Sequence, residues 1–129
     1  MPNDRGRRLS AEEVERLLRR ARTDFKASGF LVGSPLHTSQ DFQDLGLVAH
    51  DDQLEAIGRV LDEISSDHYC GPHPPQHLSS EPKCKGKRMI QFSWTSACFG
   101  NASMYVKFCL KDDRFVLLRI HRDAYKRKL

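Results

Sequence analysis

The stretch "SMYVKFCLKDDRFVLLRIHRD", residues 103–123, decides the fold because it holds two runs typical of paired β-strands. β-Branched and aromatic residues dominate both runs, and "KDD" between them is a turn signal. Side chains alternate between two faces along a strand. In the first run the apolar set is Met104, Val106, Phe108 and Leu110, with Tyr105, Lys107 and Cys109 between them. The stretch therefore predicts an amphipathic hairpin.

The length of the loop determines which side chains of the hairpin share a face. In the second run one alternating set is Val116, Leu118 and Ile120, and the other is Phe115, Leu117, Arg119 and His121. A two-residue turn would pair odd positions with even ones and mix apolar with polar sets. A three-residue loop, either 111–113 or 112–114, pairs odd with odd. Since a one-residue slip flips a whole strand, we predict the three-residue loop. It places four polar side chains on one face at one end: Tyr105, Lys107, Arg119 and His121.

The rest of the chain predicts a single α+β domain over residues 1–129. Two amphipathic helices are expected, at 10–29 with a capping box of Ser10 and Glu13, and at 51–65 with Asp51 or Asp52 as the cap. A brief helical turn capped at Ser39 and ending at Gly46 is expected between them, and 30–37 is a short strand or a loop. The run "RMIQFSW", 88–94, adds a strand. Helices first and strands last predict N-terminal helices packed on one face of an antiparallel sheet.

Composition and charge narrow the class of protein. The chain has 129 residues, of which 39% are hydrophobic and 29% charged, and no apolar run approaches the roughly 20 residues that cross a bilayer. The scattered cysteines and the absence of an apolar leader indicate a reducing cytoplasm. Residues 83–129 contain 12 Lys/Arg and 3 Asp/Glu, a net charge of +9, whereas 1–82 contain 9 and 14, a net charge of −5. The basic part favours a polyanionic partner, with a merely solvated surface as the alternative.

The four clustered side chains suit metal-free cleavage of RNA. The attacking 2′-OH must lose a proton and the leaving 5′-oxygen must gain one, which suits His121, with Tyr105 as a second candidate. Arg119 and Lys107 can stabilise the charge that develops on the phosphorus. RNA carries the nucleophile that DNA lacks, so the chemistry itself would select RNA. The alternative is a hairpin face that is only solvated.

A family resemblance rests on four short motifs in a fixed order. They are Leu45-Gly46-Leu47, then Asp67 with Tyr69 at a helix end, Tyr105-Val106-Lys107, and Arg119-Ile120-His121. In this order, over about residues 38–123, the chain resembles the MqsR family of toxins (motility quorum-sensing regulators), which are mRNA interferases of bacterial toxin–antitoxin pairs. The resemblance implies a RelE-like fold with a curved antiparallel sheet, metal-independent cleavage of mRNA, no cofactor, and neutralisation by an antitoxin protein.

The resemblance also implies roles for individual residues. Tyr105 matches the family's functional tyrosine, Lys107 its strand lysine, and His121 a basic position of its last strand. His68 and Tyr69 would line the site from the helix end, and Gln91 is a candidate for the family's functional glutamine. Cys70 stands where the family has a lysine.

The segment "CGPHPPQHLSSEPKC", 70–84, carries a second group of candidate residues. Zinc accepts the side-chain types of Cys70, His73, His77 and Cys84, but their spacing matches no standard knuckle. We favour an irregular, cation-rich substrate loop over 68–88, whose end would meet phosphates through Lys83, Lys85, Lys87 and Arg88.

Three functions follow in order of preference. The first is a metal-independent endoribonuclease toxin that acts on mRNA in the cytoplasm and is inhibited by an antitoxin. The second is a non-catalytic nucleic-acid-binding module, stabilised by zinc through the segment 70–84. The third is a degenerate family member that binds only a partner protein.

Overall fold

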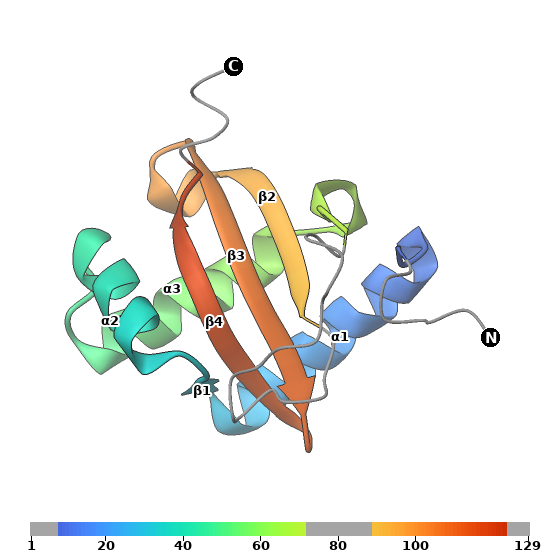
Figure 1. Ribbon diagram of the computed structural model, residues 1–129, viewed down its shortest axis with the longest axis horizontal. Coiled ribbons are helices and arrows are strands. Elements are labelled where there is room, and N and C mark those ends of the chain that lie inside the picture. Colours follow the sequence, from blue (N-terminus) through green and yellow to red (C-terminus); the bar gives the residue numbers. More distant parts are fainter. Residues whose placement is uncertain (1–7, 72–88, 124–129) are drawn as a thin grey trace.

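A computed structural model describes residues 8–71 and 89–123, which form three helices and a four-stranded sheet (Figure 1). The elements in chain order are α1 (Ala11–Ser28), β1 (Phe30–Val32), α2 (Pro35–Asp44), α3 (His50–Glu63), a 3₁₀ turn (Ser66–His68), β2 (Ile90–Ser96), a second 3₁₀ turn (Ala97–Phe99), β3 (Ala102–Lys111) and β4 (Arg114–Arg122). The α+β class predicted from the sequence is confirmed.

The sheet is mixed, and this corrects the prediction of a purely antiparallel one. Its strand order is β1-β4-β3-β2, with β2, β3 and β4 antiparallel and β1 parallel to β4. The segment that the sequence left open between strand and loop is therefore a short edge strand. Figure 1 shows α1 and α3 behind the sheet and α2 beside β4. We call the face covered by α1 and α3 the inner face, and the opposite one the outer face.

The helix ends follow the sequence rules only in part. The capping box of Ser10 and Glu13 is present, and Gly29 ends α1 with φ of 69°. The prediction for α2 is wrong at its start: the helix begins at Pro35, whose fixed φ suits a first helical position, and Ser39 lies inside it. The cap predicted for α3 is also wrong, because Ala49 is the N-cap and Asp51 and Asp52 lie in the first turn.

The core fills the space between the inner face and the two helices behind it. From the helices it takes Val14, Leu18, Ile57 and Leu61, and from the strands Phe92, Trp94, Met104, Val106, Phe108, Phe115, Leu117 and Ile120. Phe92, Phe108 and Phe115 pack in sequence, with ring centroids 5.8 and 4.8 Å apart. Burial of this apolar surface fixes the inward set of each strand, and so fixes which side chains point outward.

The β3–β4 hairpin keeps its polar side chains on one face, but through a different turn from the one predicted. Asp112 and Asp113 form a two-residue turn, both with positive φ (54° and 60°), as type I′ requires. The register then slips, because Phe108 pairs with Leu117 but Lys107 pairs with Arg119. Leu118 is thus the extra residue of a β-bulge. The three-residue loop is wrong, yet the bulge restores odd-with-odd pairing beyond it.

Helix α2 covers the edge of β4 beyond the end of β1. Buried Thr38 donates its hydroxyl hydrogen bond to the carbonyl of Leu118, the bulged residue, at 2.9 Å. Gly33 N–H donates to the neighbouring carbonyl of Leu117, also at 2.9 Å. Two carbonyls of β4 at the bulge are therefore satisfied by the segment that leads into α2 and by its first turn.

Within residues 8–71 and 89–123, no helix is both long enough and apolar enough to cross a membrane.

Candidate active site

The four predicted catalytic residues meet on the outer face as two adjacent cross-strand pairs. Tyr105 lies directly opposite His121, with ring centroids 5.0 Å apart, and Lys107 lies directly opposite Arg119. All four side chains are partly exposed. The clustering predicted from alternation is therefore present in the structure.

Tyr105 is held by a hydrogen-bond chain that runs onto β2. The amide nitrogen Nε2 of Gln91 donates to the carbonyl of Gly71 at 3.2 Å, so its oxygen Oε1 faces Tyr105 and accepts the phenol hydrogen. Burial raises the pKa of Tyr105, and the neighbouring Cys70 and Asp123 raise it further, while Arg119 acts in the opposite direction. Tyr105 therefore remains a neutral phenol at physiological pH and suits donation and positioning better than proton abstraction.

Arg119 is fixed by a carboxylate that lies 78 positions earlier in the chain. Its Nε and Nη2 donate to the two oxygens of Asp41 at 2.8 and 3.1 Å, and Ile120 N–H also donates to Asp41, at 3.0 Å. The hydrogen bonds to Asp41 raise the pKa of Arg119. The guanidinium is thus permanently charged and rigidly placed, and neither of its bonds to Asp41 uses Nη1.

The imidazole of His121 has a defined tautomer when it is neutral. Its Nδ1 lies 2.7 Å from the carbonyl oxygen of Arg122, and a carbonyl can only accept. Nδ1 must therefore carry the hydrogen, which leaves Nε2 as the nitrogen that exchanges a proton. A ring held in this way can take a proton from a hydroxyl or, once protonated, return it.

A second polar contact borders the pair of Tyr105 and His121. Ser93 of β2 lies opposite Tyr105, and its hydroxyl donates to the carboxylate of Asp123 at 2.9 Å. Asp123 is buried, and its backbone N–H donates to Ser103 O at 2.8 Å. Asp123 thus ties the end of β4 to β2 through its carboxylate and to β3 through its backbone N–H.

The residues expected at the helix end lie in different surroundings. Tyr69 is buried on the inner face against Phe92, and its hydroxyl accepts from Leu9 N–H at 3.3 Å. It is a core residue in this structure, and its expected role at an RNA site stays a prediction. The Nδ1 of His68 accepts from Ser65 N–H at 3.1 Å and so caps its own 3₁₀ turn. Gln91, by contrast, lies at the cluster on the outer face, where it accepts the hydrogen bond from Tyr105.

The loop predictions fall almost entirely outside the described residues. This holds for the four cations Lys83, Lys85, Lys87 and Arg88, and for three of the four suggested zinc ligands, His73, His77 and Cys84. In the described part, 8–71 and 89–123, no three His, Cys, Asp or Glu side chains converge to hold a metal ion. Both predictions remain untested.

The cysteines do not all behave as the sequence suggested. Cys70 and Cys98 carry free thiols, whereas Cys109, fully buried in β3, is disulfide-bonded. Disulfides persist mainly in oxidising compartments. The expected location in a reducing cytoplasm was argued in part from cysteines that form no disulfide. The disulfide of Cys109 removes this part of the argument.

Sequence reasoning missed Asp41, Ser93 and Asp123. Asp41 carries the clearest available signal, since it follows Thr38 by three positions on α2 and both are buried polar residues. A polar pair on a buried helix stripe has to find partners, but the sequence does not say which. Ser93 is recoverable from the same alternation that placed Tyr105, because it is an outward position of β2.

Comparison with protein-family models, with curated proteins and with solved structures finds no match for this chain. The site therefore has to be interpreted from its own geometry. It offers one proton-exchanging nitrogen, one neutral phenol, one fixed guanidinium and one lysine, all on an exposed sheet face. This set can position a phosphodiester and move a proton beside it.

Proposed function

We propose that this chain is a metal-independent endoribonuclease, an mRNA interferase toxin of a toxin–antitoxin pair with a RelE-like fold. The observation that carries the proposal is the pair of Tyr105 and His121 directly opposite each other, with Lys107 and Arg119 as the next pair along the same strands. Catalysis without a metal needs a proton carrier and fixed positive donors at one phosphate, and these four residues supply both.

Each residue has a role in the proposed reaction. The Nε2 of His121 takes the proton of the 2′-OH, and the oxygen attacks the adjacent phosphorus. Lys107 and the Nη1 of Arg119 stabilise the charge that develops on the phosphoryl oxygens. Tyr105, whose pKa is raised by burial, keeps its proton and orients the phosphate or the nucleotide. The 5′-oxygen then leaves and takes a proton from water, the protonated His121 gives its proton back to the solvent, and a 2′,3′-cyclic phosphate remains on the other product.

The substrate and partner follow from the same proposal. A single-stranded or translated mRNA in the cytoplasm would lie across the outer face, where its unstacked bases are accessible. The net charge of +9 over residues 83–129 favours such a polyanion. An antitoxin protein with acidic residues would inhibit the enzyme by covering this basic face.

A non-catalytic RNA-binding module is the second candidate, and one observation favours it. Arg119 is already engaged by both oxygens of Asp41, so part of its charge is compensated within the protein. A face of this kind can bind phosphates without stabilising a transition state.

The experiment that tests the proposal uses purified protein and a single-stranded RNA in excess EDTA. We expect cleavage, with 2′,3′-cyclic phosphate on the upstream product and 5′-hydroxyl on the downstream one. A matched RNA with 2′-O-methyl groups throughout should bind but stay intact, because it lacks the nucleophile. RNA binding without cleavage would favour the module, and cleavage of the methylated RNA would contradict the mechanism.

A further inference from the structure

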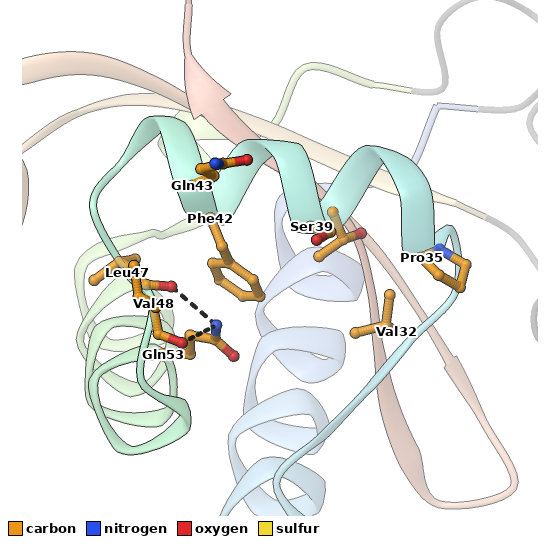
Figure 2. A pocket seen from close by; sticks show the side chains of 9 residues that line it. Val32, Pro35, Ser39, Phe42, Gln43, Leu47, Val48 and Gln53 are labelled. Atoms are coloured by element: carbon orange, nitrogen blue, oxygen red, sulfur yellow. Dashed lines mark hydrogen bonds between the residues drawn. The ribbon is translucent and has the colours of Figure 1, made fainter.

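A pocket of about 510 Å³ opens between α2 and the segment that leads into α3. None of the four proposed catalytic residues lines it. Its lining includes Val32, Pro35, Phe42, Leu47, Val48 and Gln53. Figure 2 shows Phe42 pointing from α2 into the hollow, with Leu47, Val48 and Gln53 on one side and Val32 and Pro35 on the other.

The pocket is formed by the fold itself. The Nε2 of Gln53 donates to the carbonyls of Leu47 and Val48, at 2.9 and 3.4 Å, and so fixes the connection between α2 and α3 as one wall. Phe42 is buried and packs on Phe30, with ring centroids 5.8 Å apart. Preformed pockets bind with little ordering cost, because their walls do not have to be assembled by the ligand.

The pocket lies beside unusually exposed apolar side chains. Leu36 and Val48 are the large apolar residues most exposed in the described part of the chain, each at 81%. Val48 lines the pocket, and Leu36 follows Pro35, another lining residue, on α2. Single exposed apolar residues are common, but Val48 also lines an apolar hollow, and an exposed apolar side chain in such a place is of the kind that partners cover.

The stretch of chain that supplies all the lining residues, within residues 27–58, is acidic. Residues 27–58 contain no Lys or Arg and five acidic residues: Asp41, Asp44, Asp51, Asp52 and Glu55. Asp41 is paired with Arg119 and Glu55 with Arg59, at 2.8 and 2.9 Å. The carboxylates of Asp44, Asp51 and Asp52 remain exposed at the end of α2 and the start of α3. Carboxylates in these positions attract cations and repel phosphates.

We propose that this pocket docks a protein segment that inserts an apolar side chain and carries Lys or Arg on either side of it. The apolar hollow with Val48 provides the anchor site, and the exposed carboxylates at the end of α2 and the start of α3 select the flanking charges. None of the residues that line this pocket belongs to the proposed catalytic cluster, so a basic segment bound here would not have to displace RNA from those four side chains.

The test uses two fluorescein-labelled synthetic peptides, one an amphipathic helix of leucine and lysine and the other the same peptide with glutamate in place of lysine. In fluorescence anisotropy at physiological salt, we expect the lysine peptide to bind at least about tenfold more tightly. Backbone amide shifts in a labelled protein should change most over residues 46–53. Equal affinity for the two peptides, or shifts confined to other surfaces, would overturn the proposal.

Two variants with the same change in charge locate the site. Val48→Lys removes an exposed apolar side chain and adds a cation, and should weaken binding of the lysine peptide by about tenfold or more. Thr23→Lys, an exposed position of α1 that does not line the pocket, should leave the affinity within about twofold. Equal effects of the two variants would contradict the docking site. Concentration-dependent dimerisation abolished by Val48→Lys would assign the pocket to a second copy of the chain instead.

Discussion

The outer face of the β3–β4 hairpin has two halves of opposite character. Near the turn, Cys109, Val116 and Leu118 form a small apolar cluster that is almost fully buried. Beyond the bulge, the outward positions of the same strands are Tyr105, Lys107, Arg119 and His121, all partly exposed. The first half holds the hairpin in the fold, and the second presents the chemistry.

The difference between the halves shows what the bulge does. Leu118 and Arg119 are consecutive, yet one belongs to the buried apolar cluster and the other to the polar pair. Without the extra residue, the two-residue turn would place Arg119 and His121 among the inward positions. The bulge therefore joins a two-residue turn to a site in the opposite register. The turn-proximal half should govern stability and the distal half activity.

The largest expected effect on stability comes from the turn-proximal half. Leu118→Ala removes a side chain that is 2% exposed and should lower the free energy of unfolding by about 2–4 kcal/mol. The cleavage rate per folded molecule should stay within about twofold. Urea denaturation and cleavage at equal folded concentration measure both. Leu36→Ala, an exposed leucine on α2, serves as the control and should cost under about 0.5 kcal/mol. A large loss of cleavage rate in Leu118→Ala would contradict the claim that the turn-proximal half governs stability and the distal half governs activity.

The next effect tests how the polar half is supported. Asp41→Asn leaves Arg119 without its carboxylate and weakens the bond from Ile120 N–H, so stability should fall by about 2–3 kcal/mol, less than for a fully buried pair because Arg119 is partly exposed. Thermal and urea unfolding measure the loss. Asp44→Asn lies on the same helix but is exposed, and should change stability by under about 0.5 kcal/mol. Equal losses of stability in the two variants would mean that the ion pair between Asp41 and Arg119 does not account for the effect of Asp41→Asn.

A carboxylate behind the sheet supports the same distal end and gives a pH dependence. Burial raises the pKa of Glu63, but hydrogen bonds donated by Ser96, Trp94 and the N–H of Cys98 outweigh it, so the pKa lies below the ordinary value of 4.5. A pKa lowered by folding stabilises the folded state above about pH 4.5, and this contribution is lost as the pH falls through the folded value.

Glu63→Gln isolates this contribution. The variant should be less stable than the intact protein by about 1–2 kcal/mol at pH 7, and the difference should shrink as the pH falls below about 4.5, because Glu63 becomes protonated and then is as neutral as glutamine. Urea denaturation from pH 3 to pH 7 measures it. In Glu55→Gln, which breaks an exposed pair with Arg59, the difference should stay small at every pH. A Glu63→Gln difference that grows in acid would contradict the assignment.

The smallest expected effect on stability compares the phenols of Tyr105 and Tyr69. Tyr105→Phe removes the donor to Gln91 and should cost about 1 kcal/mol of stability while lowering the cleavage rate about tenfold. Tyr69→Phe removes the acceptor of Leu9 N–H and should cost a similar stability, with the cleavage rate unchanged. Unfolding and cleavage assays on both variants compare them directly. A rate loss in Tyr69→Phe would place that residue in the site after all.

These halves also show how far the sequence could be interpreted. Alternation correctly grouped Tyr105, Lys107, Arg119 and His121, because burial of the apolar sets dictates which side chains point outward. It could not reveal the bulge, since a three-residue loop and a two-residue turn with one extra strand residue give the same parity beyond it. The consecutive aspartates at 112 and 113 were the available hint, because aspartate tolerates the positive φ that both residues adopt in the turn.

The sequence alone could not predict the contacts between residues that are far apart in the chain. Asp41 and Arg119 are 78 positions apart, and nothing local indicates that α2 lies against β4 at the bulge. The parallel pairing of Phe30–Val32 with β4 is of the same kind, because a three-residue strand carries no periodicity. The core position of Tyr69 was not predicted, because a helix-end tyrosine can turn to either face of the sheet, and only the packing against Phe92 decides.

The most direct test of the polar half as an RNA-cleaving site is the cleavage rate of one single-stranded RNA in EDTA by the intact protein, His121→Ala and His50→Ala. His121 exchanges the proton in the proposed reaction, whereas His50 is an exposed histidine at the start of α3. We predict that His121→Ala lowers the rate at least about a hundredfold with unchanged folding, and that His50→Ala stays within about twofold of the intact protein. A rate for His121→Ala within about threefold of the intact protein would contradict the account.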